Sequence, residues 1–124
     1  MRYLAQAATL AVVLGSGTFA VADEERPEHF AGESAETLEQ AVTNFSEYNQ
    51  RLEELLNQEL TPERMAKIHE LSYTLENALA KIDEEVDLMS VLLEDMHLAS
   101  ESADPRTTKN AGKAYLNSGQ TLVE

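Results

Sequence analysis

The side chains of this sequence best suited to bind a metal ion or a haem are its histidines and methionines. His69 and His97 lie four heptads apart and therefore share one face of the helix predicted there. Along a straight helix this spacing corresponds to about 42 Å, too far for one ion. Met96 adjoins His97, and Met with His binds copper or axial haem iron. His69, His97 and Met96 are therefore the metal-ligand candidates.

A structural role is the more common one for each of these side chains. The methionines fall in an apolar helical stripe, where Met usually fills the core. His69-Glu70 begins like a zinc-protease helix, but Tyr73 stands where the second histidine ligand is needed. The absence of cysteine excludes disulfides, thiolate metal sites and c-type haem. Because no phosphate-binding loop or nucleophile elbow is present, we expect no enzyme activity, no catalytic residue and no cofactor.

Residues 1–22 have the pattern of a cleavable export signal. Arg2 supplies a positive start, residues 7–14 are apolar, and Ala20-Val21-Ala22 precedes the acidic residues 23–25. The apolar run is too short to cross a bilayer, which takes about 20 residues. We expect cleavage after Ala22, a periplasmic location, and no membrane contact after cleavage.

The charge of the chain excludes another class of function. Its formal net charge is −14, and the predicted leader contains none of the acidic residues. A surface this acidic repels nucleic-acid phosphates, so we expect no nucleic-acid partner. The acids alternate with apolar helical positions, which is typical of a solvated helix face.

After the leader, the sequence predicts an extended arm followed by a single helical domain. Residues 23–33 lack a helical period, whereas residues 34–124 are helical in pattern. The arm contains a cation and two rings, Arg26, His29 and Phe30, which are partner-binding candidates. The arm either docks on the helices, captures a partner, or is a disordered tail.

Three antiparallel helices are predicted in the domain. Ser34 as N-cap predicts a first helix over 34–60, and Thr61-Pro62 starts a central helix over 62–102. Asp104-Pro105 repeats that start for a third helix over 105–122. Because the connections are short, the first and third helices should each lie along one half of the central helix. Its apolar heptad, which includes Met65, Leu79, Val86 and Leu93, should face them.

A break in the central helix near 83–87 is the alternative. It would give a compact four-helix bundle and bring His69 and His97 together. The segment contains no turn residue and keeps the heptad in phase, which favours the straight helix.

The second half of the central helix is apolar on more than one face. Leu88, Val91 and Leu98 lie off the main stripe, and the short third helix cannot cover them as well. An apolar surplus of this kind usually marks an interface, so Val91 and Leu98 are partner-binding candidates. We expect a homodimer that completes a four-helix layer there.

Several stretches resemble a family of small exported Gram-negative proteins that is known only as a domain of unknown function. They are RPEHFAG at 26–32, ETL at 36–38, HELSYTLE at 69–76, HLAS at 97–100 and AYL at 114–116. The resemblance covers the chain after the leader, and its most specific part is the arm. It implies a helical fold and a periplasmic location, and supplies no activity or site residue.

A weaker, fold-level likeness is to the four-helix cytochromes of the b562 and c′ type. Their haem residues are missing, because the first helix has no Met, the last has no His, and no Cys-x-x-Cys-His is present. The leading hypothesis is therefore a small acidic periplasmic interaction or structural module with an unknown protein partner. The alternative is a periplasmic metal- or haem-binding protein that uses Met and His side chains.

Overall fold

The computed structural model describes residues 30–123. The predicted leader 1–22 and the first arm residues 23–29, which include Arg26 and His29, lie outside the described residues. Within them the chain forms three helices, α1 (Leu38–Leu56), α2 (Pro62–Glu101) and α3 (Pro105–Val123), and no strand. The predicted all-α fold is confirmed.

Helix α2 is continuous through all of its 40 residues and spans about 60 Å. The central helix predicted over 62–102 is confirmed, and the alternative with a break near 83–87 is wrong. The physical reason is local, since residues 83–87 contain no Gly or Pro and each can extend the helix.

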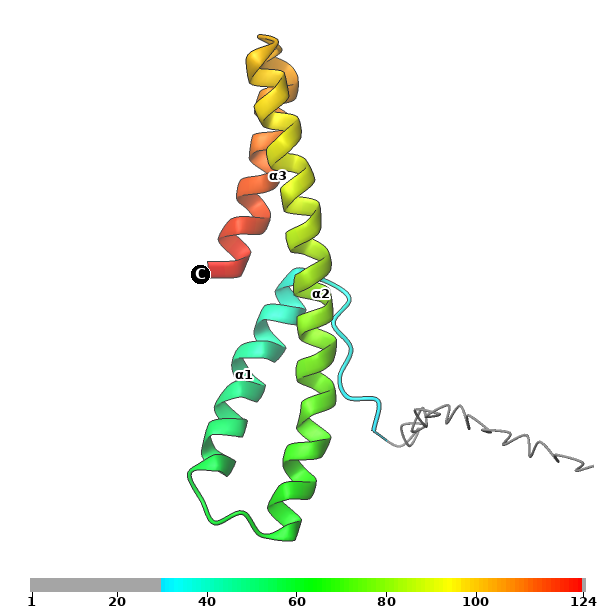
Figure 1. Cartoon of the computed structure of the whole chain (residues 1–124), viewed down its shortest axis with the longest axis vertical. Coiled ribbons are helices and arrows are strands. Elements are labelled where there is room, and N and C mark those ends of the chain that lie inside the picture. Colours follow the sequence, from blue (N-terminus) through cyan, green and yellow to red (C-terminus); the bar gives the residue numbers. More distant parts are fainter. Residues whose placement is uncertain (1–29, 124) are drawn as a thin grey trace, which may run out of the picture.

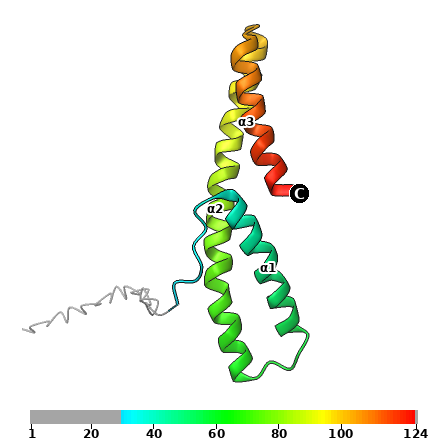
Figure 2. The same ribbon diagram turned by 180° about the vertical axis from the view of Figure 1, so that it is seen from behind.

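Helices α1 and α3 pack antiparallel along the two halves of α2 (Figure 1). The start of α1 and the end of α3 approach one another near the middle of α2, and the view from behind shows the same arrangement (Figure 2). Away from that middle, the described part of the molecule is a rod only two helices thick.

The starts of α2 and α3 form as their cap-and-proline pairs predict. The Thr61 hydroxyl accepts a hydrogen bond from the backbone N–H three residues later, and Pro62 opens the helix. Asp104 Oδ1 accepts hydrogen bonds from the backbone N–H groups of Arg106 and Thr107. The Thr107 hydroxyl donates to Asp104 Oδ2 at 2.7 Å. These hydrogen bonds, led by that of the hydroxyl, lower the pKa of Asp104.

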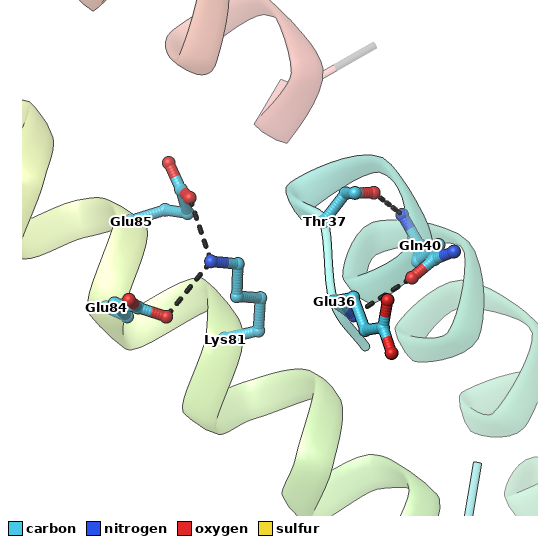
Figure 3. A network of polar contacts seen from close by, with 6 residues as sticks. All are labelled: Glu36, Thr37, Gln40, Lys81, Glu84 and Glu85. Carbon is cyan, nitrogen blue, oxygen red and sulfur yellow. Dashed lines mark hydrogen bonds and ion pairs between the residues drawn. The ribbon is translucent and has the colours of Figure 1, made fainter. Parts of the chain in front are cut away.

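Helix α1 is shorter than the range 34–60 that the sequence predicts. Its N-cap is Thr37 rather than Ser34, and the Thr37 hydroxyl accepts from the Gln40 N–H at 3.2 Å. The Gln40 side chain in turn accepts from the Glu36 N–H, which makes a reciprocal cap (Figure 3). Residues 34–36 therefore belong to the arm, and residues 57–61 form the turn into α2.

Small residues form much of the helix contacts. Ala41 of α1 and Ala78 of α2 are completely buried, which lets the two backbones approach closely. The other buried apolar residues are Leu38, Tyr48, Leu71, Tyr73, Ala99 and Ala111. In the described residues no large side chain is completely buried. Each half of the rod thus has a narrow contact line rather than an enclosed core.

The predicted apolar seam of α2 is wrong in part. Met65, Leu79, Val86 and Leu93 are 42–52% exposed. The buried residues Leu71, Ala78 and Ala99 lie on the neighbouring side of the helix, where α1 and α3 pack. A two-helix contact covers one side of an apolar stripe and leaves the other side open.

Candidate interaction surfaces

The described part of the arm lies along α2 and is bound by its side chains (Figure 1). The Glu33 N–H donates a hydrogen bond to Thr74 Oγ1 at 3.0 Å. Asn77 Nδ2 donates to two arm carbonyls, those of Ala31 at 3.0 Å and Glu33 at 2.9 Å. From Phe30 onward the arm is therefore a docked segment with specific partners on the helix.

Gly32 brings the arm into direct contact with the backbone of α2. Its φ is +69°, in the left-handed region that glycine adopts without strain. A Cβ at this position would lie 2.7 Å from the backbone atoms Thr74 N and Tyr73 C. Both the conformation and the space at residue 32 thus require glycine.

Tyr48 of α1 holds the arm from its other side. Its hydroxyl donates to Glu33 Oε1 at 2.7 Å, and the Arg51 guanidinium lies 4.5 Å from the ring centroid. The hydrogen bond to the Glu33 carboxylate, together with burial, raises the pKa of Tyr48. Because both helices bind the arm, the arm fastens α1 to α2 beyond their own contact.

An aromatic cluster lies where the arm first meets α2. Phe30 stacks on Tyr73 with ring centroids 6.4 Å apart, and the rings of Phe30 and His69 are arranged edge-to-face at the same centroid distance. The Tyr73 hydroxyl lies 3.2 Å from His69 Nε2. The predicted partner-binding residue Phe30 and the predicted metal ligand His69 are thus both engaged in arm docking.

The other metal-ligand candidates do not converge with His69. His97 lies four heptads along the straight α2, about 42 Å away. Its Nε2 lies 3.3 Å from a Glu101 carboxylate oxygen. Met96 Sδ packs against α3, 3.0 Å from where a Cβ on Gly112 would be. Among residues 30–123 no three His, Cys, Asp or Glu side chains are arranged to hold a metal ion.

A second surface lies further along the arm-binding face of α2. Leu88, Val91 and Leu98 are 50%, 58% and 51% exposed, and we call them the α2 patch. Leu88 follows the arm-binding Asn77 by three helical turns and so lies on the same face. The arm covers the first part of this face and leaves the patch open. Acidic residues flank the patch at positions 84, 87, 94 and 95.

Sequence reasoning located Phe30, Val91 and Leu98 but missed the residues that hold the arm. The sequence pattern singles out none of the three residues Tyr48, Thr74 and Asn77. The sequence did offer one signal of a binding site: the polar side chains of Thr74 and Asn77 lie three positions apart beside an apolar seam. Their role depends on a segment more than 40 residues away in the sequence.

The chain belongs to the family of unknown function DUF6746, whose model matches residues 1–124. Comparison with curated proteins and with solved structures finds no match. The expectation of an uncharacterised family is thereby confirmed, whereas Gram-negative origin, the arm as the family motif and the likeness to cytochromes stay predictions. None of the described helices is long and apolar enough to cross a membrane.

Proposed function

We propose that this protein is an exported interaction module that binds a protein partner through the α2 patch. The observation that carries the proposal is the exposure of Leu88, Val91 and Leu98, each at least half open on one face of a rigid helix. Large apolar side chains grouped on one surface favour association, because covering them removes apolar area from water.

The docked arm supports the proposal because it is an example of what this face of α2 binds. Thr74 and Asn77 hold an extended segment by its backbone, and Tyr73 receives an aromatic side chain from it. The α2 patch offers apolar contacts on the same side of the helix, three turns further along. A partner segment laid there would continue the path of the arm along α2.

The charge around the patch indicates the chemistry of the partner. From Ile82 to Glu101 helix α2 contains seven acidic residues and no Lys or Arg. Lys81, just before this stretch, is already paired with Glu84 and Glu85 at 3.0 and 3.2 Å, which raises its pKa (Figure 3). The remaining acids favour a partner segment that combines apolar side chains with Lys or Arg.

The binding test uses the full processed protein and two short extended peptides. One peptide alternates Leu and Lys, which places them on opposite faces of an extended segment, and the other replaces each Lys with Glu. We expect the basic peptide to bind more tightly by at least about tenfold at low salt, and less so at high salt. Equal binding of the two peptides would contradict the assignment of a cationic partner.

Substitutions then locate the site. The double substitution Val91→Asp and Leu98→Asp should abolish binding of the basic peptide and of any partner captured from a periplasmic extract. Leu60→Asp is the matched control, because Leu60 is 48% exposed but lies in the turn between α1 and α2. If the patch variant binds as well as the Leu60 variant, the patch is not the binding surface.

Export is tested separately. We expect the protein in the periplasmic fraction after osmotic shock, with Asp23 as its first residue after cleavage at Ala22. A mature protein that keeps residues 1–22 would contradict the predicted signal.

A further inference from the structure

The side of the rod opposite the arm is apolar along α2. Met65, Leu79, Val86 and Leu93 repeat at multiples of seven residues and therefore share one face. Leu79 follows the arm-binding Asn77 by two positions, which places it about 160° around the helix from the arm. We call this exposed row the open stripe.

The two shorter helices extend the same surface. In α3, Gly112 and Gly119 pack against Met96 and Met89 of α2, and these two methionines lie beside the open stripe. Leu116 lies between the two glycines in the sequence. In α1, Asn44 and Tyr48 bind the arm, whereas Phe45 and Leu56 lie on the other flank. Phe45 is 36% exposed, and Leu56 and Leu116 are 55% exposed. The open stripe is thus the centre of an apolar surface that involves all three helices.

The size of this surface matches what a stable interface needs. The open stripe is four heptads long, about 42 Å. The apolar surface around it also includes the neighbouring α1 and α3, so this surface is about 20 Å wide and has an area of about 800 Å². A standard interface buries about 800 Å² per partner. The α2 patch runs from residue 88 to residue 98, a length of about 15 Å, on a single helix about 10 Å wide, so its area is only about 150 Å². The open stripe, rather than the surface around Val91 and Leu98 that the sequence indicates, is therefore the better dimer surface, and the patch suits a shorter partner segment.

The packing of the rod indicates that a second helical pair belongs there. The described chain buries no large side chain completely and is two helices thick over most of its length. Two such pairs laid face to face give a four-helix cross-section, in which facing apolar rows enclose a core. The open stripe keeps the heptad spacing that this packing requires.

The charges favour a second copy of this chain as the occupant. Helix α3 contains Arg106, Lys109 and Lys113 and no acidic residue, and these three share an exposed face. None of the three makes an ion pair within the described residues. The second half of α2 has the opposite character, with seven acids and no Lys or Arg. One copy therefore carries both halves of a complementary pair.

We propose that two copies form a parallel homodimer through their open stripes, related by a twofold axis along the rod. Turning a second copy by 180° about that axis and laying it on the open stripe places α3 of each copy over α2 of the other. The basic residues of one α3 then lie beside Glu94 and Glu101 of the partner's α2. An antiparallel pairing would instead lay α2 on α2, and the basic residues of α3 would lie away from Glu94 and Glu101 of the partner.

The test measures the mass of the purified, processed protein alone, so its outcome does not depend on the partner of the α2 patch. Light scattering and sedimentation from 1 to 100 µM should give twice the chain mass. The double substitution Leu79→Glu and Val86→Glu should weaken the dimer by at least about 100-fold, because it places four charges in the apolar interface. Val91→Glu with Leu98→Glu is the matched control, since these equally exposed residues lie on the same helix, and it should leave the dimer intact.

Charge swapping tests the parallel arrangement. Lys109→Glu with Lys113→Glu should weaken the dimer by about tenfold or more, and Glu94→Lys with Glu101→Lys in the same chain should restore it. A carbodiimide should join Lys109 or Lys113 of one chain to Glu94 or Glu101 of the other.

Three results would overturn the proposal. They are a wild-type protein that is monomeric at 100 µM, a stripe variant that remains a dimer, and a failure of the charge swap to restore association. Helicity by circular dichroism checks that the variants are folded, because Leu79 and Val86 are already exposed in the single chain.

Discussion

Gly32→Ala tests whether the arm is an integral part of the fold. An alanine at φ +69° costs about 1 kcal/mol in backbone strain. Its Cβ would also lie 2.7 Å from Thr74 N and Tyr73 C, and neither backbone atom can move without bending α2. The arm must therefore shift away from the helix.

The size of the effect follows from what the arm loses by moving. The Glu33–Thr74 hydrogen bond and the two from Asn77 contribute about 1 kcal/mol each. The conformational entropy that the released arm regains offsets part of this loss. We expect Gly32→Ala to lower the free energy of unfolding by about 2–4 kcal/mol.

Urea unfolding followed by circular dichroism at a fixed protein concentration measures this change. Gly119→Ala is the matched control, because its Cβ would lie 3.6 Å from Met89 Cε, an ordinary contact inside a helix. The control should stabilise by about 0.5–1 kcal/mol. Amide exchange should show lost protection of the Glu33 N–H in the Gly32 variant alone. If Gly32→Ala stays within about 0.5 kcal/mol of the wild type, the arm does not contribute to stability as argued.

Two further substitutions have outcomes of known sign. Ala103 follows α2 with a φ of +54°, and the Asp104 N–H donates a hydrogen bond to the Ala99 carbonyl as in a Schellman motif. Glycine adopts this left-handed conformation without strain. Ala103→Gly should therefore raise the free energy of unfolding, measured in urea, by about 1 kcal/mol. The pKa of Tyr48 is raised, so the folded chain holds the phenol proton more tightly than the unfolded chain does. The protonated phenol therefore stabilises the fold below pH 10.0, the ordinary pKa of tyrosine, and this stabilisation is lost as the pH rises through the pKa of the folded state. Tyr48→Phe should remove that alkaline loss in thermal melts between pH 8 and 11, and an unchanged pH profile would contradict the hydrogen bond to Glu33.

The sequence alone determined the helices and their order. The pairs Thr61-Pro62 and Asp104-Pro105 mark helix starts through local hydrogen bonds and a fixed φ, which depend on neighbouring residues only. The continuity of α2 follows from the absence of Gly and Pro, and the short turns force α1 and α3 back along it. The predicted N-cap Ser34 was wrong because Thr37, three residues later, caps the helix instead.

The tertiary structure decided which faces are covered. The apolar stripe of α2 is wide enough for another helix to pack on either of its two edges. Only the positions of α1 and α3 determine that Ala78 is buried and that Leu79 is exposed. The arm site likewise joins Gly32 to Tyr73 and Thr74, whose close approach leaves no periodic mark in the sequence. Local patterns encode helix ends and lengths, whereas contacts between distant segments depend on how the formed helices pack.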